Sequence, residues 1–257
     1  GLCVAPLSSV AAATQPLNIL VLYADDWRHD TLGAAGHPVV KTPNLDQLAA
    51  EGVRFTHNCV TTSICGVSRA SLFTGQWMSR HGNPAFNFFT TPWAETYPGL
   101  LRDHGYYVGH IGKWHNGSQW PFHPNARGFT EYYGFTSGHW GEYFDAPLEH
   151  NGVMVKSEGY IVDVLTDKAL QFIERNKARP FLCYVPFTTP HSPFSVPPQD
   201  WEQYKDKPLI QTAVLPKEEN PDATRCVLAM LANQDRNVGR ILAKLKELGY
   251  SDAFPIK

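Results

Sequence analysis

Side chains that can do chemistry follow three apolar stretches of this sequence. They share a place directly after a predicted strand: Asp25 and Asp26 after residues 18–24, Lys113 and His115 after 106–111, and His191 after 181–187. Each stretch is mainly apolar and is bounded by turn or helix signals, which is typical of a buried strand. Ligands of open α/β sheets bind at the carboxyl ends of the strands. We therefore expect two carboxylates, one ammonium group and two imidazoles to meet in one site.

Cys65 stands in a setting that suits a nucleophile or an anion site. Residues 66–75 can form a helix that ends at Gly75, which places Cys65 at the helix N-terminus. Free amide groups and the positive end of the helix dipole favour a negative group there by about 0.3–1 kcal/mol. Arg69 lies one turn on, on the same face as Cys65. A small buried cysteine beside a surface arginine would give the same pattern, so the helix alone leaves both interpretations open.

Helix signals lie between the predicted strands. They are Thr42-Pro43 before residues 44–51, Thr96 and Pro98 before a short helix ending at Gly105, an apolar stripe over 161–173, and a longer stripe over 228–245. Thr42 and Pro43 suit the N-cap and the first position of a helix. Strands that alternate with helices predict the α/β class, with a mainly parallel sheet flanked by helices.

Residues 120–155 differ from the rest of the chain, because they are rich in Gly, Pro, Asn and aromatic residues and show weak periodicity. We interpret this stretch as a long excursion over the sheet that contacts substrate. Its aromatic side chains suit either stacking on sugar rings or packing in the core. They are Trp120, Phe122, Tyr132, Tyr133, His139, Trp140 and Tyr143.

Composition sets wider limits. With 257 residues, 43% hydrophobic and 18% charged, the chain is typical of a globular protein, and a formal net charge of -2 gives no reason to expect nucleic acid as a partner. We expect no membrane span, because no run approaches about 18 apolar residues. The five cysteines show no CxxC spacing. Residues 1–16 look like a signal-peptide remnant or N-terminal tail, and a signal peptide would predict export. We expect a single domain over residues 17–257.

Residues 65–69 (CGVSR), followed by Thr74-Gly75, resemble the signature of type I sulfatases, in which the cysteine is converted to formylglycine. Four further stretches resemble motifs of that family in the same order: 18–26 with its Asp pair, 42–49, 112–115 (GKWH) and 190–194 (PHSPF). The resemblance implies the alkaline-phosphatase-like α/β fold and hydrolysis of sulfate esters. The layout is similar to that of iduronate-2-sulfatase-like glycan sulfatases, whose substrates are sulfated carbohydrates.

The resemblance also implies a metal site and a modification. Formylglycine at Cys65 would be hydrated to a diol that attacks the ester sulfur, and one of its oxygens would join Asp25 and Asp26 around a divalent cation. A hard, oxygen-liganded ion is implied, with Ca²⁺ favoured and Mg²⁺ as the alternative. The implied partners are a formylglycine-generating enzyme and a sulfated carbohydrate or other sulfate ester.

Four more residues receive catalytic roles from the resemblance. Arg69 and Lys113 would hold the diol and sulfate oxygens through charge-assisted hydrogen bonds. His115 would take a proton from the diol, and His191 would contact the sulfate and protonate the departing alcohol. An exported sulfatase of this kind would be periplasmic or extracellular, or lysosomal in a eukaryote.

Two departures from the family pattern limit these expectations. Val67 stands where the commonest pattern has Pro or Ala, which bears on recognition by the converting enzyme. After Gly249 the chain offers eight residues, where the family has a further strand with metal ligands and a later lysine. We therefore expect the N-terminal part of a sulfatase, truncated at its C-terminus. Two alternatives stay open: a phosphatase or phosphodiesterase of the same superfamily, and a non-catalytic truncated sulfatase-like protein.

Overall fold

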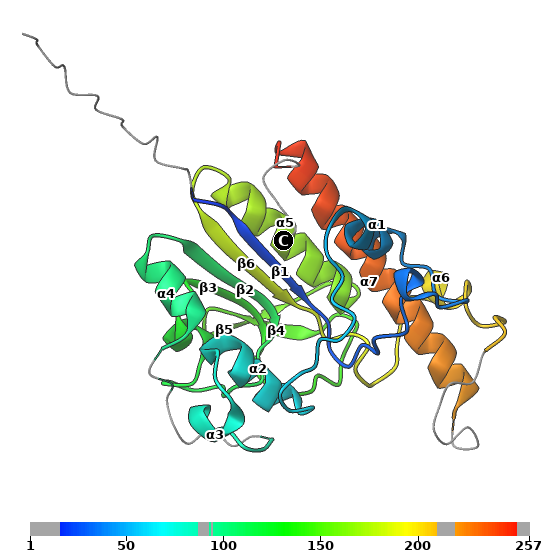
Figure 1. The fold of residues 1–257 in the computed structure, drawn as a ribbon, viewed down its shortest axis with the longest axis horizontal. Coiled ribbons are helices and arrows are strands. Elements are labelled where there is room, and N and C mark those ends of the chain that lie inside the picture. Colours follow the sequence, from blue (N-terminus) through cyan, green and yellow to red (C-terminus); the bar gives the residue numbers. More distant parts are fainter. Residues whose placement is uncertain (1–15, 87–92, 94, 210–218, 251–257) are drawn as a thin grey trace, which may run out of the picture.

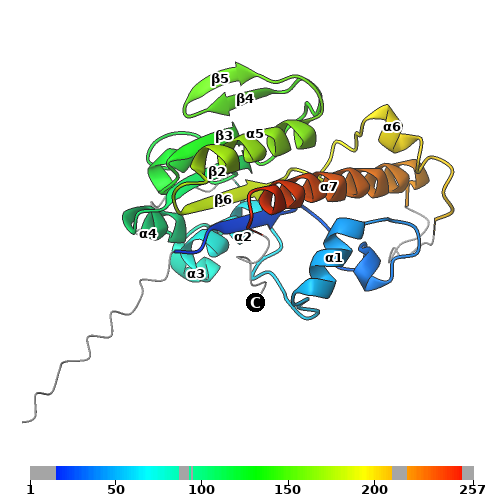
Figure 2. The same ribbon diagram turned by 90° about the horizontal axis from the view of Figure 1, so that it is seen from above.

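A computed structural model describes residues 16–86, 93, 95–209 and 219–250. The predicted N-terminal segment 1–16, apart from Pro16, lies outside the described residues. A twisted sheet forms the middle layer, and helices cover both of its faces (Figures 1 and 2). The described part of the chain contains no helix that is both long enough and apolar enough to cross a membrane.

The described strands form a six-stranded sheet in the order β1-β6-β2-β3-β4-β5. Their bounds are β1 Ile19–Tyr23, β2 Tyr107–Lys113, β3 Glu131–Phe135, β4 Pro147–His150, β5 Val153–Lys156 and β6 Phe181–Pro186. β1, β6, β2 and β3 run parallel, and β4 and β5 are antiparallel additions. The predicted mainly parallel sheet is therefore confirmed, and the three predicted strands lie within two residues of the observed bounds.

Helices fill the connections. They are η1 Gly33–Ala35, α1 Pro43–Glu51, α2 Cys65–Thr74, α3 Met78–His81, α4 Tyr97–Asp103, η2 Pro124–Arg127, α5 Ile161–Asn176, α6 Pro198–Trp201 and α7 Pro221–Glu247. α2 begins at Cys65 and ends before Gly75, whose φ of 65° is the left-handed conformation that a C-cap glycine adopts at no steric cost. The predicted helix over 66–75 is confirmed, with Cys65 as its first residue.

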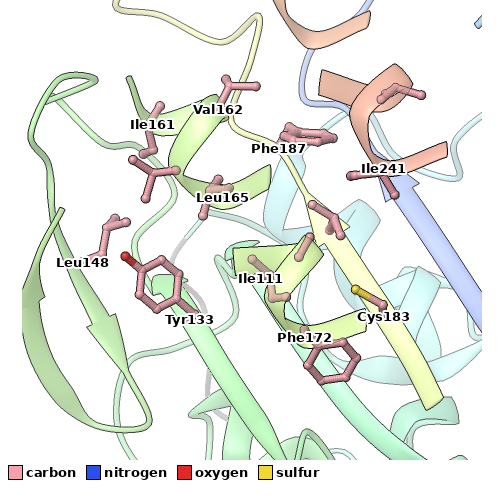
Figure 3. Packing of buried hydrophobic residues seen from close by; sticks show 14 of the residues in the cluster. Ile111, Tyr133, Leu148, Ile161, Val162, Leu165, Phe172, Cys183, Phe187 and Ile241 are labelled. Atoms are coloured by element: carbon pink, nitrogen blue, oxygen red, sulfur yellow. The ribbon is translucent and has the colours of Figure 1, made fainter. Parts of the chain in front are cut away.

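Two hydrophobic cores lie on opposite faces of the sheet. Phe181, Cys183 and Val185 of β6 face the helices α5 and α7, in the core that Figure 3 shows from close by. Leu182 and Tyr184 face the other way, toward α2 and α4. Alternate residues of a strand point to opposite faces, so a strand covered on both faces needs a continuous apolar run. This requirement explains why the three predicted strands were visible in the sequence.

Thr42 is the N-cap residue of α1 and Pro43 its first helical residue, as predicted, but another side chain caps the helix. The Thr42 side chain makes no capping hydrogen bond to the helix; its hydroxyl accepts from the amide of Gly33 and donates to Asp46. Asp235 of α7 takes the capping role instead, because its carboxylate accepts from the backbone amides of Asn44 at 3.2 Å and Leu45 at 2.8 Å. A carboxylate at this position satisfies the free amides and the positive end of the helix dipole.

The interpretation of 120–155 as an excursion over the sheet is wrong, because this stretch supplies β3, β4 and most of β5. The backbone of β3 is irregular at Gly134, where φ is 154° and an added Cβ would lie 2.0 Å from the carbonyl oxygen of Gly112. Tyr132, Tyr133 and Tyr143 are buried packing residues, whereas Trp120 is 71% exposed. Most of the aromatic content here therefore serves the core.

Candidate active site

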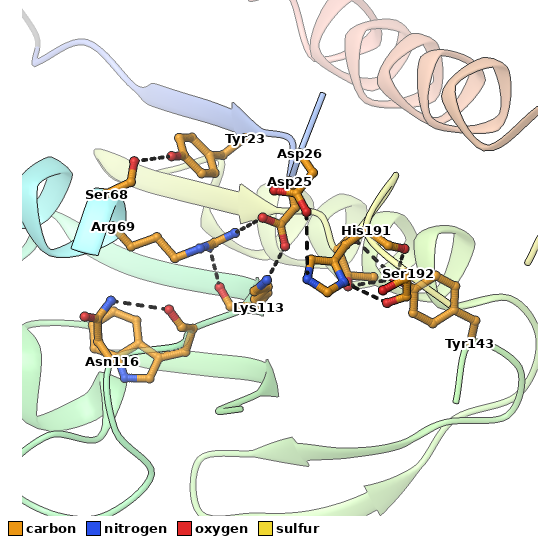
Figure 4. A network of polar contacts seen from close by, with 12 residues as sticks. Tyr23, Asp25, Asp26, Ser68, Arg69, Lys113, Asn116, Tyr143, His191 and Ser192 are labelled. Atoms are coloured by element: carbon orange, nitrogen blue, oxygen red, sulfur yellow. Dashed lines mark hydrogen bonds and ion pairs between the residues drawn. The ribbon is translucent and has the colours of Figure 1, made fainter. Parts of the chain in front are cut away.

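The carboxyl ends of β1, β2 and β6 meet at one edge of the sheet, beside the first turns of α2 (Figure 4). Asp25 and Asp26 follow β1, Lys113 is the last residue of β2, and His191 follows β6. The amide of Asp25 donates to the carbonyl of Thr189 at 3.1 Å, which holds the loops after β1 and β6 together. The predicted residues thus come from separate parts of the chain to one place.

Asp25 lies between two buried cations. Lys113 has no exposed surface and donates a hydrogen bond to Oδ2 of Asp25, whose side chain is also buried. Nη2 of Arg69 lies 3.9 Å from Oδ1 of the same carboxylate. Buried charges are tolerated where opposite charges pair with them. The sequence resemblance assigned Lys113 to the sulfate, whereas in this structure its ammonium group contacts the carboxylate assigned to the metal.

Arg69 is held rigidly but retains unused hydrogen-bond donors. Its Nη1 donates to the carbonyl oxygen of Lys113 at 2.8 Å, and its guanidinium lies 5.0 Å from the ring centre of Tyr23. Among the described residues, Nε and Nη2 find no hydrogen-bond acceptor although the side chain is wholly buried. A buried donor without an acceptor costs about 1–3 kcal/mol, and more on a charged group. An oxyanion at this position would remove that cost.

The imidazole of His115 is enclosed by two glycines and one aromatic ring. A Cβ on Gly138 would lie 2.1 Å from Nε2, and a Cβ on Gly66 would lie 3.0 Å from the His115 carbonyl oxygen. Phe86 stacks on the imidazole with ring centres 6.1 Å apart and an interplanar angle of 21°. Burial, reinforced by the positive charges of Lys113 and Arg69, lowers the pKa of His115 to about 4. The imidazole is therefore neutral near pH 7 and can accept a proton.

His191 presents one ring nitrogen to the site. Its Nδ1 lies 2.7 Å from the carbonyl oxygen of Ser192, which can only accept, so Nδ1 carries the proton. Nε2 then lies 3.8 Å from Oδ2 of Asp26. The Tyr143 hydroxyl donates to the carbonyl oxygen of His191 at 2.8 Å and fixes this loop. Asp26 has a φ of 62° and a largely exposed carboxylate, so it points into the open part of the site.

Cys65 is half-buried, is not in a disulfide, and stands at the first position of α2. Ile64, the N-cap residue, provides no side-chain cap, so the first amides of α2 are not satisfied by their own N-cap. Its neighbours fix its surroundings: Gly66 packs on His115, and Arg69 reaches Asp25 and Lys113. Cys65 therefore begins a helix whose first two turns both contact the site.

The donor set fits part of a site for a hard cation. Asp25 and Asp26 supply carboxylate oxygens, the ligands that Ca²⁺ and Mg²⁺ prefer. The negative charges of these two carboxylates balance the positive charges of Arg69 and Lys113. The negative charge of a bound sulfate ester would therefore be neutralised only by an added cation. Within the described ranges, however, no group of three or more His, Cys, Asp or Glu residues is arranged to hold a metal. The described residues thus fit a partial coordination shell.

Sequence reasoning missed several residues of this site. Tyr143 was considered for sugar stacking or core packing but not as a support of the His191 loop, Phe86 was not considered, and the close contact of Gly138 with His115 was not foreseen. None of the three lies at the end of a predicted strand, which was the signal used. Gly138 lies three residues after β3, a strand that the sequence analysis did not predict, so the strand-end signal could not point to it.

The fold and this site define an α/β protein that places a helix-mounted cysteine beside a buried arginine and a carboxylate pair. The chain belongs to the sulfatase family, a family of sulfuric ester hydrolases: the family profile, described as Sulfatase, matches residues 17–254. The recognition made from the motifs is therefore confirmed.

Individual relatives agree with the family match. N-acetylgalactosamine-6-sulfatase of Canis lupus familiaris is 32% identical over 274 residues, covering 94% of this chain and 49% of the relative. N-acetylglucosamine-6-O-sulfatase of Bacteroides thetaiotaomicron is 31% identical over 180 residues, covering 69% of this chain and 31% of the relative. The chain spans about half the length of the first of these relatives.

Solved structures give the same fold. Ps i-CgsB in complex with k-i-k-neocarrahexaose is 31% identical with a TM-score of 0.80, over 93% of this chain and 57% of that chain. A phosphonate monoester hydrolase of Agrobacterium radiobacter shares the fold at 21% identity and a TM-score of 0.70. The alkaline-phosphatase-like fold predicted from the motifs is confirmed.

Proposed function

We propose that this protein hydrolyses sulfate esters of carbohydrates, with a formylglycine made from Cys65 and one divalent cation. The observation that carries the proposal is the wholly buried Arg69, whose Nε and Nη2 find no acceptor among the described residues, one turn after Cys65. Such donors suit the oxygens of a tetrahedral oxyanion. The relatives that act on sulfated N-acetylhexosamines support a carbohydrate ester as the substrate class.

The cation would be Ca²⁺, with Mg²⁺ as the alternative, held by Asp25, Asp26 and the oxygen of residue 65. Such an ion would supply positive charge next to the sulfate oxygens. Formylglycine, as its hydrate, would supply the oxygen nucleophile. We propose that a formylglycine-generating enzyme makes this residue and that the protein is exported, whether to the periplasm, the extracellular space or a lysosome.

The protein's own side chains would then have distinct tasks. Arg69 would donate Nε–H and Nη2–H to sulfate oxygens and keep its Nη1–H on the carbonyl of Lys113. Lys113 would hold Asp25 in place through their ion pair and lend positive charge to the same oxygens. The neutral imidazole of His115 would accept the proton of the attacking hydroxyl, while Nε2 of His191 would face the leaving alcohol oxygen.

Mass spectrometry of the peptide that contains residue 65 tests the modification directly. Protein produced together with a formylglycine-generating enzyme should carry an aldehyde at Cys65. Cys65→Ala should abolish release of sulfate and leave the circular dichroism spectrum and melting temperature unchanged. Cys59→Ala is the matched control, because Cys59 is an exposed free cysteine outside the site. Sulfate release by Cys65→Ala at the wild-type rate would disprove the assignment of the nucleophile.

A comparison of substrates separates the remaining alternatives. Faster release of phosphate from an aryl phosphate than of sulfate from the matching aryl sulfate would favour a phosphatase or phosphodiesterase. Release of neither, by protein that carries the aldehyde, would favour a non-catalytic member of the family.

A further inference from the structure

Phe86 is an exposed aromatic side chain mounted on the site. It is 58% exposed, although aromatic rings of this size usually gain by burial. Its ring stacks on the imidazole of His115, which belongs to the site. The reactive neighbour of Phe86 is thus buried while Phe86 itself is open to solvent. A ring in this position can cover a ligand that reaches His115.

His139 holds a similar place on the second imidazole. Its exposed ring lies with its centre 5.5 Å from the ring centre of His191, at an angle of 49°. The preceding residue, Gly138, packs on Nε2 of His115, so this loop touches both imidazoles. Phe86 and His139 therefore approach the same pair of histidines from two separate loops. One comes from the loop after α3 and the other from the loop after β3.

The chemistry of the two rings points to the ligand. Both present flat faces without a fixed negative charge, whereas in the proposed function Arg69 and Lys113 would bind the sulfate. The apolar face of a pyranose ring fits such a surface, and its sulfate ester group would reach the donors of Arg69. Inorganic sulfate would contact only the charged residues Arg69 and Lys113 and neither of the two rings.

We propose that Phe86 and His139 form the walls of a subsite for the sugar ring that carries the sulfate, with Phe86 as the stacking platform. This proposal rests on the proposed function for its ligand, a sulfated pyranose. Phe86 is then a specificity residue: it distinguishes a sulfated sugar from other sulfate-bearing anions and leaves the binding of the sulfate group to Arg69 and Lys113.

The test measures binding in the Cys65→Ala background, which prevents turnover of the ligand. Two probes are titrated by calorimetry: N-acetylhexosamine 6-sulfate and inorganic sulfate. The sugar should bind more tightly than inorganic sulfate. Phe86→Ala should weaken binding of the sugar about 2- to 10-fold, the range of an aromatic contact, and leave the affinity for inorganic sulfate unchanged. Phe86→Trp should retain the affinity for the sugar.

Phe144→Ala is the matched control, because Phe144 is also exposed but packs on Tyr160 rather than on a site histidine. It should change neither affinity. Equal binding of the two probes by the parent protein, or equal weakening of both by Phe86→Ala, would overturn the subsite. Sugar binding that depends on Phe86, together with no sulfate release by the parent protein carrying the aldehyde at Cys65, would instead refute the proposed function and leave the subsite standing.

Discussion

Gly138→Ala places one methyl group against the imidazole of His115 and leaves every charged group of the site in place. The new Cβ would lie 2.1 Å from Nε2, 2.2 Å from Cε1 and 2.6 Å from Cδ2. Ordinary contact begins near 3.4 Å, so the edge of the ring has to move by about 1.3 Å. Gly66 and Phe86 pack on other parts of the ring, so we expect the imidazole to leave its present position rather than shift within it.

A displacement of this size has a calculable cost. Misplacement of a reacting group by about 1 Å can lower the rate about 10²-fold, which corresponds to about 2.7 kcal/mol of transition-state stabilisation. We therefore expect kcat/KM for a sulfated sugar to fall about 100-fold in Gly138→Ala. The pKa of His115, held at about 4 mainly by burial, should rise toward the 6.5 of an open imidazole. Steady-state kinetics and an NMR titration of the imidazole measure the two effects separately.

Gly109→Ala provides the control. Its Cβ would lie 2.3 Å from the ring of Phe172, in the core rather than in the site. Overpacking there should cost about 1–3 kcal/mol of stability, while folded molecules retain their turnover. If Gly138→Ala instead turns over within twofold of wild type and keeps the low pKa of His115, then the imidazole has no fixed position in catalysis and the reasoning fails.

Two further predictions concern the cation and pH. Asp26→Asn should weaken Ca²⁺ binding about tenfold in a calcium titration, because affinity follows the charge of the ligands and asparagine tolerates the φ of 62° at this position. The control is Asp30→Asn, at an exposed carboxylate paired with Arg28, which should have no effect. Equal affinities in all three proteins would exclude Asp26 as a ligand. The pKa of His115 is about 4 in the folded chain against 6.5 when unperturbed. The unfolded chain therefore binds more protons between these pH values, and the free energy of unfolding should decline as pH falls from 6.5 to 4. Urea unfolding at pH 7 and pH 4.5 should show a smaller decline for His115→Gln than for the wild type, and an equal decline would contradict this account.

Much of the fold was predictable because its signals are local. β2 and β6 are buried on both faces and β1 is half-buried, so each is an apolar run that the sequence displays. The end of α2 followed from Gly75, which caps the helix. β3 escaped prediction because aromatic residues and Gly134 break the usual alternation within five residues.

The site was predictable at its strand ends and not elsewhere. The carboxyl ends of parallel strands lie at the same edge of the sheet whatever the loops do, so Asp25 and Lys113 were expected at one edge, although β6 separates their strands. The contacts of Phe86 and Gly138 with His115 depend on how two loops fold back, and no pattern of spacing records that. The pairing of Lys113 with Asp25, rather than with an anion, also depends on distances that sequence does not contain.

Because a carboxylate of α7 caps α1, formation of α1 depends on a residue far along the chain. A nine-residue helix is too short to persist alone in water, and the amides at its start are satisfied by Asp235, some 190 residues later in the chain. Gly239, one turn beyond Asp235, lets α7 approach α1 so closely that an added Cβ would lie 2.4 Å from the Asn44 side chain. We therefore expect α1 to become stable only after α7 has docked, which during synthesis on the ribosome requires that the residues of α7 have emerged.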